Sequence, residues 1–90
     1  MYALVKEILD TSKEKKVDVV TARDMVIATA KNQDKTREAY SIISKYYDLI
    51  TFYRRNDDEA GIKNVCALYE ANNTKEIDGI INKLKKENKI

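Results

Sequence analysis

The stretch KTREAYSIISKYYDLITFYRRN, from Lys35 to Asn56, decides how this chain is expected to fold. With about 100° of rotation per residue, its apolar side chains fall within about 120° of one another, which is the pattern of a helix that buries one face. The members of this stripe are Ala39, Ile42, Ile43, Tyr46, Leu49, Ile50 and Tyr53. The sequence therefore predicts one long helix over residues 35–56, which at 1.5 Å per residue spans roughly 30 Å.

Aromatic residues alternate with Lys and Arg in this stretch, and such a mixture is also typical of surfaces that stack on nucleic-acid bases. Tyr46 and Tyr53 belong to the stripe itself. Tyr40 and Tyr47 lie at its edge, where a ring can pack while its hydroxyl stays in water. We interpret all four tyrosines as packing residues, with base stacking as the alternative.

Phe52 falls on the opposite side of the predicted helix, among the charged residues Arg37, Lys45, Asp48 and Arg55. Nothing in the helix's own pattern requires a phenyl ring there. A neighbouring helix could cover it, a partner or second copy could cover it, or it is one of the isolated exposed apolar residues that are normal in proteins. If a partner binds, Phe52 is the best candidate for its anchor, with these four charged residues around it.

Apolar periodicity and capping residues predict the other helices. They are expected at 2–15, at 22–32 with Thr21 as N-cap and Asp24 completing a capping box, at 59–71 after a stop in 56–59, and from Thr74 onward, with a left-handed cap at Asn72–Asn73. The predicted fold is all-α. We expect one domain over residues 1–90, a small antiparallel bundle of four to five helices with the long helix at its centre.

The amino-acid composition limits which kinds of metal site and catalytic site the chain can form. The 90 residues include no His and a single cysteine, Cys66, so an internal disulfide and a His-based metal site or catalytic triad are excluded. Cys66 lies on the predicted apolar face of its helix, with no His to activate it as a nucleophile. We therefore expect a protein that is not an enzyme and that needs no cofactor or metal.

The charge balance leaves the class of partner open. Seventeen basic and fifteen acidic residues give a net charge of +2 and a pI near 8.6, below the range typical of a dedicated nucleic-acid-binding domain. Basic residues nevertheless gather near predicted helix ends, where they could contact phosphates or simply lie in solvent as the helix dipole favours. These residues are Lys13, Lys15, Lys16, Arg23, Arg54, Arg55, Lys83, Lys85, Lys86 and Lys89.

The N-terminal segment contains Lys6, Glu7 and Asp10, which interrupt its apolar residues, so we expect no signal peptide. No stretch approaches the roughly 20 apolar residues that span a bilayer. The expected location is cytoplasmic.

As a helical bundle of this length with a long third helix and a basic tail, the chain resembles small bacteriocin immunity proteins. In size and in its composition rich in Lys, Asn, Ile and Tyr, it is similar to small phage-encoded regulators. These resemblances imply a regulatory or immunity-type protein that acts by binding, and they assign no role to any residue. We expect a soluble binding protein that acts through protein–protein contacts or self-association. The alternative is a DNA-binding regulator that uses the basic residues at the helix ends.

Overall fold

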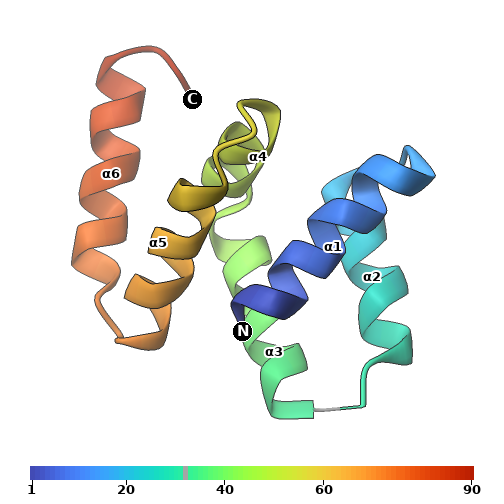
Figure 1. Ribbon diagram of the computed structural model, residues 1–90. Helices are drawn as coiled ribbons and strands as arrows, with labels where there is room; N and C mark the ends of the chain where they lie inside the picture. Colours follow the sequence, from blue (N-terminus) through green and yellow to red (C-terminus); the bar gives the residue numbers. More distant parts are fainter. Residues whose placement is uncertain (32) are drawn as a thin grey trace. The chain divides into compact units, whose positions relative to one another are not determined.

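The computed structural model describes residues 1–31 and 33–90, the side chain of residue 33 excepted, and in that part of the chain every regular element is an α-helix (Figure 1). The helices there are α1 (Tyr2–Lys15), α2 (Val19–Thr29), α3 (Gln33–Lys45), α4 (Tyr47–Arg55), α5 (Glu59–Glu70) and α6 (Thr74–Lys86). The predicted all-α fold is confirmed. The described residues hold six helices rather than four or five, because the predicted long helix is divided in two.

The helices group into two compact units, Met1–Lys45 and Tyr46–Ile90. The first unit holds α1, α2 and α3, and the second holds α4, α5 and α6. The expectation of a single domain over residues 1–90 stays a prediction.

In the first unit each helix packs against the other two. The buried apolar side chains of this unit are Val5, Ile8, Leu9, Val19, Ala22, Val26, Ala39, Ile42 and Ile43. Ser12 is also buried, and its hydroxyl donates to the carbonyl oxygen of Val17 at 2.6 Å, which supplies the partner that a buried hydroxyl needs. The three helices thus enclose a core made mostly of aliphatic side chains.

In the second unit α5 packs against both α4 and α6, and α5 and α6 run side by side in opposite directions (Figure 1). The buried apolar side chains are Tyr46, Leu49, Ile50, Tyr53, Ile62, Val65, Cys66 and Ile77. The rings of Tyr46 and Tyr69 meet edge to face, with centroids 6.2 Å apart and planes at 81°, an arrangement that aromatic pairs favour. With the first unit, this core confirms that every residue of the predicted stripe from Ala39 to Tyr53 is buried.

The prediction of one continuous helix over 35–56 is wrong, because the chain leaves the helical conformation at Tyr46, where φ is −119° and ψ is 35°. Residues 41–47 are Ser, Ile and Tyr apart from Lys45, and these are weaker helix formers than Ala or Leu. The Ser44 hydroxyl donates to the carbonyl oxygen of Tyr40 at 2.7 Å, a local bond that bends helices. Periodicity therefore identified the buried face but not the break.

The predicted start of the second helix is also corrected. Asp18, not Thr21, is the N-cap of α2, and its carboxylate accepts a hydrogen bond from the backbone N–H of Thr21 at 2.7 Å. Asp caps a helix at least as well as Thr, and the earlier start places Val19 in the core. The helix then ends at Thr29, whereas the predicted end, residue 32, lies outside the described residues.

In the described part of the chain, four helices end on a left-handed residue, and none of these residues is glycine. They are Lys16, Asp57, Asn72 and Asn88, with φ of 56°, 51°, 57° and 57°. In each case the next backbone N–H reaches back to a carbonyl in the last helical turn, as when Asn73 donates to Leu68 at 2.8 Å. The left-handed cap predicted at Asn72–Asn73 is confirmed.

Candidate interaction surfaces

Helix α6 is only partly covered within its unit. Its apolar residues recur at 77, 80, 81 and 84, the spacing of one helical stripe. Ile77 is buried, while Ile80, Ile81 and Leu84 are half-buried. Within the described residues the main neighbour of α6 is α5, and one helix covers only part of such a stripe. Part of this apolar surface therefore stays in contact with solvent.

A shallow hollow of about 550 Å³ lies against one side of α6 and is lined by Asn73, Lys75, Glu76, Gly79, Ile80 and Lys83. Four of these residues, Glu76, Gly79, Ile80 and Lys83, follow one another at i, i+3, i+4 and i+7, so they form one edge of the helix, called here the α6 edge. A Cβ atom placed on Gly79 would meet nothing within 4 Å. The missing side chain of Gly79 therefore leaves this part of the hollow open.

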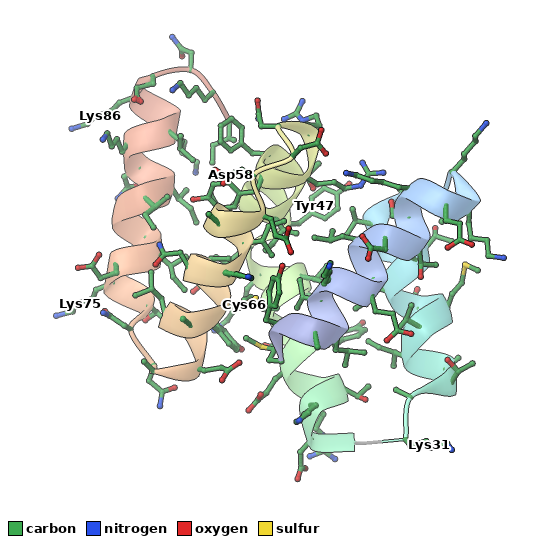
Figure 2. All side chains as sticks on the ribbon, viewed as in Figure 1. Lys31, Tyr47, Asp58, Cys66, Lys75 and Lys86 are labelled. Atoms are coloured by element: carbon green, nitrogen blue, oxygen red, sulfur yellow. The ribbon has the colours of Figure 1, made fainter. Side chains whose placement is uncertain are left out.

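The α6 edge has opposite charges at its two ends. Glu76 lies in the first turn of α6 and Lys83 in the last, and both side chains are exposed. Within the described residues, neither side chain makes an ion pair. Figure 2 shows two further lysines, Lys75 and Lys86, pointing away from α5 at opposite ends of the helix. The edge is thus an apolar centre between one unpaired acid and one unpaired base.

A second hollow, of about 480 Å³, lies in the first unit among α1, the end of α2 and the start of α3. Its lining is Met1, Ala3, Leu4, Glu7, Val26, Thr29, Ala30, Lys31, Lys35 and Thr36. The charged members, Glu7, Lys31 and Lys35, are all exposed and of both signs. Specific small-molecule sites have a few polar groups that converge on the ligand, and exposed charges of mixed sign do not provide that arrangement.

Arg23, one of the predicted phosphate contacts, is instead packed inside the first unit. Its guanidinium carbon lies 4.0 Å from the centroid of the Tyr40 ring, and Nη1 donates to the Ser44 hydroxyl at 2.8 Å. Nε and Nη2 both donate to one carboxylate oxygen of Asp24, at 3.1 and 3.0 Å. Only 8% of the residue is exposed. The guanidinium is therefore occupied by its own chain, and we assign Arg23 a structural role rather than a nucleic-acid contact.

The predicted partner face around Phe52 no longer rests on one helix. Arg37 and Lys45 belong to α3, whereas Asp48, Phe52 and Arg55 belong to α4, and the break at Tyr46 ends the continuous helical face that united them in the prediction.

The four charged residues of that face are exposed, while Phe52 is half-buried with its ring centroid 5.7 Å from that of Tyr53. A role for these five residues in partner binding stays a prediction.

The remaining basic residues lie at helix ends, as predicted. Lys13, Lys15 and Lys16 are exposed at the end of α1, and Lys83, Lys85 and Lys86 are exposed in the last turn of α6. Arg55 is exposed, and Lys89 lies 3.8 Å from the carboxylate of Glu87 in an exposed ion pair. Arg54 is half-buried, and its Nε atom is buried with no hydrogen-bond partner in the described residues. Contact between any of these residues and nucleic acid stays a prediction.

Cys66 is buried in α5 (Figure 2). Burial, followed by the nearby charge of Glu70, raises the pKa of its thiol to about 11, which keeps the thiol protonated at neutral pH. Among the described residues, no three acidic or cysteine side chains come together as metal ligands, and none of the helices is both long and apolar enough to cross a bilayer. The described side chains offer no activated nucleophile at this position.

The sequence interpretation missed the α6 edge. The signal was present as a glycine in the middle of an amphipathic helix, flanked by an acid three residues before it and a base four residues after it. Glycine is unfavourable inside a helix by roughly 1 kcal/mol relative to alanine, so a position like this one calls for a packing reason. That Gly79 faces open space could be learned only from the tertiary structure.

Comparison of the chain with protein-family models, with curated proteins and with solved structures found no match.

Proposed function

We propose that this chain is a non-enzymatic binding protein that acts through protein–protein contacts made by the α6 edge. The observation that carries the proposal is the half-buried Ile80 beside the hollow at Gly79, on a helix whose main packing partner within the described residues is α5. An apolar anchor next to a depression, with charged residues around it, is how protein-binding surfaces are built. The buried, protonated Cys66 thiol agrees with a non-enzymatic role.

Site-specific photo-crosslinking tests this function directly. Lys75, which is exposed and lines the hollow without belonging to the α6 edge, would be replaced by the photoreactive amino acid p-benzoylphenylalanine, and Asn64, exposed on α5, would carry the same group as a matched control. Irradiation in an extract of cells that express the chain, and of the purified chain at about 1 mM, should give a discrete adduct from position 75 and none from position 64. Mass spectrometry identifies the captured molecule, and the same pair must then form a complex when both components are purified. The absence of any adduct at position 75 under both conditions would refute the proposed function.

The alternative is nucleic-acid binding, which is favoured by the exposed lysines at the ends of α1 and α6. It requires an affinity that falls steeply as salt rises, because phosphate contacts release counterions. The crosslinking experiment separates the two functions, since an adduct to nucleic acid disappears on nuclease treatment and an adduct to protein does not.

A further inference from the structure

The α6 edge is complementary to a second copy of itself. If two edges run antiparallel about a two-fold axis that passes between residues 79 and 80, Glu76 of each copy faces Lys83 of the other. Under the same operation, Ile80 of each copy faces Gly79 of the other. Such a contact is isologous, meaning that both copies use the same surface, as a closed dimer requires.

We propose that two copies of this chain associate through their α6 edges, antiparallel, with Ile80 of each copy seated in the hollow at Gly79 of the other. This inference rests on the proposed function, because it names the partner of the same surface. The partner is a second copy of the chain. It is recognised by an apolar contact between Ile80 and Gly79 and by an ion pair between Glu76 and Lys83, and the two-fold axis forms each of them twice.

Steric fit supports this occupant. Ile80 is half-buried beside the open space over Gly79, so each copy supplies both a partly exposed aliphatic side chain and a neighbouring position without a side chain. Small residues let helix backbones approach closely, which a branched side chain at position 79 would prevent. Gly79 and Ile80 are adjacent in the sequence, so a single two-fold axis brings Ile80 of each copy to Gly79 of the other.

The charges at the two ends of the α6 edge favour antiparallel docking of the two helices over parallel docking. Glu76 and Lys83 are seven residues apart, about 10.5 Å along the helix, which is too far for them to pair within their own helix. Neither makes an ion pair within the described residues. Antiparallel docking gives each a partner of opposite charge. Parallel docking in register would instead place Glu76 against Glu76 and Lys83 against Lys83, which is unfavourable.

The contact is small. The edge spans about two helical turns, and interfaces at the low end of the size range form weak and transient complexes. Association should therefore be reversible and visible only at high protein concentration.

Sedimentation equilibrium of the full chain, from about 20 μM to about 1 mM protein at low salt, tests the inference. The unmodified chain should show a reversible monomer–dimer equilibrium. Glu76→Lys or Lys83→Glu should each weaken dimerisation at least about fivefold, because two attractive pairs become two repulsive ones. An equimolar mixture of the two variants should recover the dimer, and so should the double variant Glu76→Lys/Lys83→Glu.

The double variant also separates pairing between copies from the helix dipole. An acid in the first turn and a base in the last are favoured within a single helix, so exchanging them weakens the isolated helix. Recovery of the dimer despite that loss can come only from pairing between copies.

Two further variants complete the test, one as a control and one as a probe of the steric fit. Lys85→Glu makes the same charge change in the same last turn but lies outside the hollow lining, so it should leave the dissociation constant within about twofold. Gly79→Ala adds a methyl group that meets no described atom of its own chain within 4 Å, so the monomer should melt at a higher temperature while the dimer weakens.

The outcomes distinguish this inference from the function on which it rests. A chain that stays monomeric throughout this concentration range, or a dimer that Lys83→Glu leaves unchanged, overturns the inference. If position 75 then crosslinks to a different protein, the proposed function stands without it. If position 75 crosslinks to nothing, both fail.

Discussion

The two units of this chain differ in how their three helices cover one another's apolar faces. In the first unit each of the three helices packs against both others. In the second unit the main packing pairs are α4 with α5 and α5 with α6. A helix with two neighbours can bury a wide apolar face, and a helix with one can bury only a narrow one. The difference explains why Ile8 in α1 is fully buried while Ile80 in α6 is not.

The two units also differ in how the charged side chains of Arg23, Glu76 and Lys83 are paired. The first unit engages the whole guanidinium of Arg23 with Tyr40, Ser44 and Asp24. On the second unit's α6, Glu76 and Lys83 make no ion pair within the described residues. The comparison teaches that helix packing leaves part of the apolar stripe of α6 uncovered and, within the described residues, leaves Glu76 and Lys83 without an ion pair, which is why the proposed interaction surface lies there.

The largest expected effect compares the two isoleucines directly. Ile8→Ala should lower the free energy of unfolding by roughly 2–5 kcal/mol, because it leaves a cavity among three helices. Ile80→Ala should lower it by less than about 1 kcal/mol, since this side chain is already partly in water. Urea unfolding followed by far-ultraviolet circular dichroism, at low protein concentration, measures both. Equal losses would remove the distinction between the units.

Alkaline pH should act on the second unit. Burial is the largest cause that raises the pKa of Tyr46, Tyr53 and Cys66, with Cys66 moving from 9.0 to about 11. A raised pKa in the folded state gives stability that is complete below the unfolded pKa and is lost as pH rises through the folded one. The thiol alone should therefore account for a loss on the order of 2 kcal/mol by about pH 11.

Melting curves recorded between about pH 8 and about pH 11 check this expectation. Cys66→Ala should remove the part of the loss that begins near the ordinary thiol pKa and leave the tyrosine part. Identical pH profiles for the two proteins would show that the thiol is not buried in solution.

The two glycines sharpen the contrast within the second unit. A Cβ on Gly61 would lie 2.6 Å from a ring atom of Tyr53, so Gly61→Ala should destabilise the protein by about 1–2 kcal/mol. Gly79→Ala meets open space and should stabilise the monomer by about 0.5–1 kcal/mol. Thermal melts of both variants, at a concentration where the chain is monomeric, should shift in opposite directions. A stabilising Gly61→Ala would contradict the close approach of α4 and α5.

The smallest effects are expected at the left-handed caps, one in each unit. Lys16→Gly should stabilise the first unit by about 0.5–1 kcal/mol, because a left-handed conformation is strained for lysine and not for glycine. Asn72→Gly should gain a few tenths of a kcal/mol at most, since asparagine tolerates that conformation. Denaturation midpoints measured side by side would show whether the two gains differ in this order.

How much of this could be predicted from the sequence is clear at particular residues. The buried stripe from Ala39 to Tyr53 was predicted in full, because helical periodicity is a local property of the sequence. The break at Tyr46 was missed, since weak helix propensity over residues 41–47 permits a break without requiring one. The start of α2 was misplaced because Asp18 and Thr21 are both good caps.

The candidate site was harder to predict than the fold. The prediction that placed Phe52 on one face with Arg37 assumed a continuous helix, and the helix is interrupted at Tyr46. Arg23 looked like a solvent-facing base because the sequence does not show that Tyr40 and Ser44 lie next to it.

By itself the sequence determined an all-helical chain, its buried apolar faces and the left-handed end at Asn72, because these depend on residues a few positions apart. Only the tertiary structure decided that the helices form two units, that Arg23 packs inside one of them, and that Gly79 faces open space. Those properties depend on which helices become neighbours. Spacing along a single helix specifies which side of it is apolar, and leaves undetermined how much of that side another helix will cover.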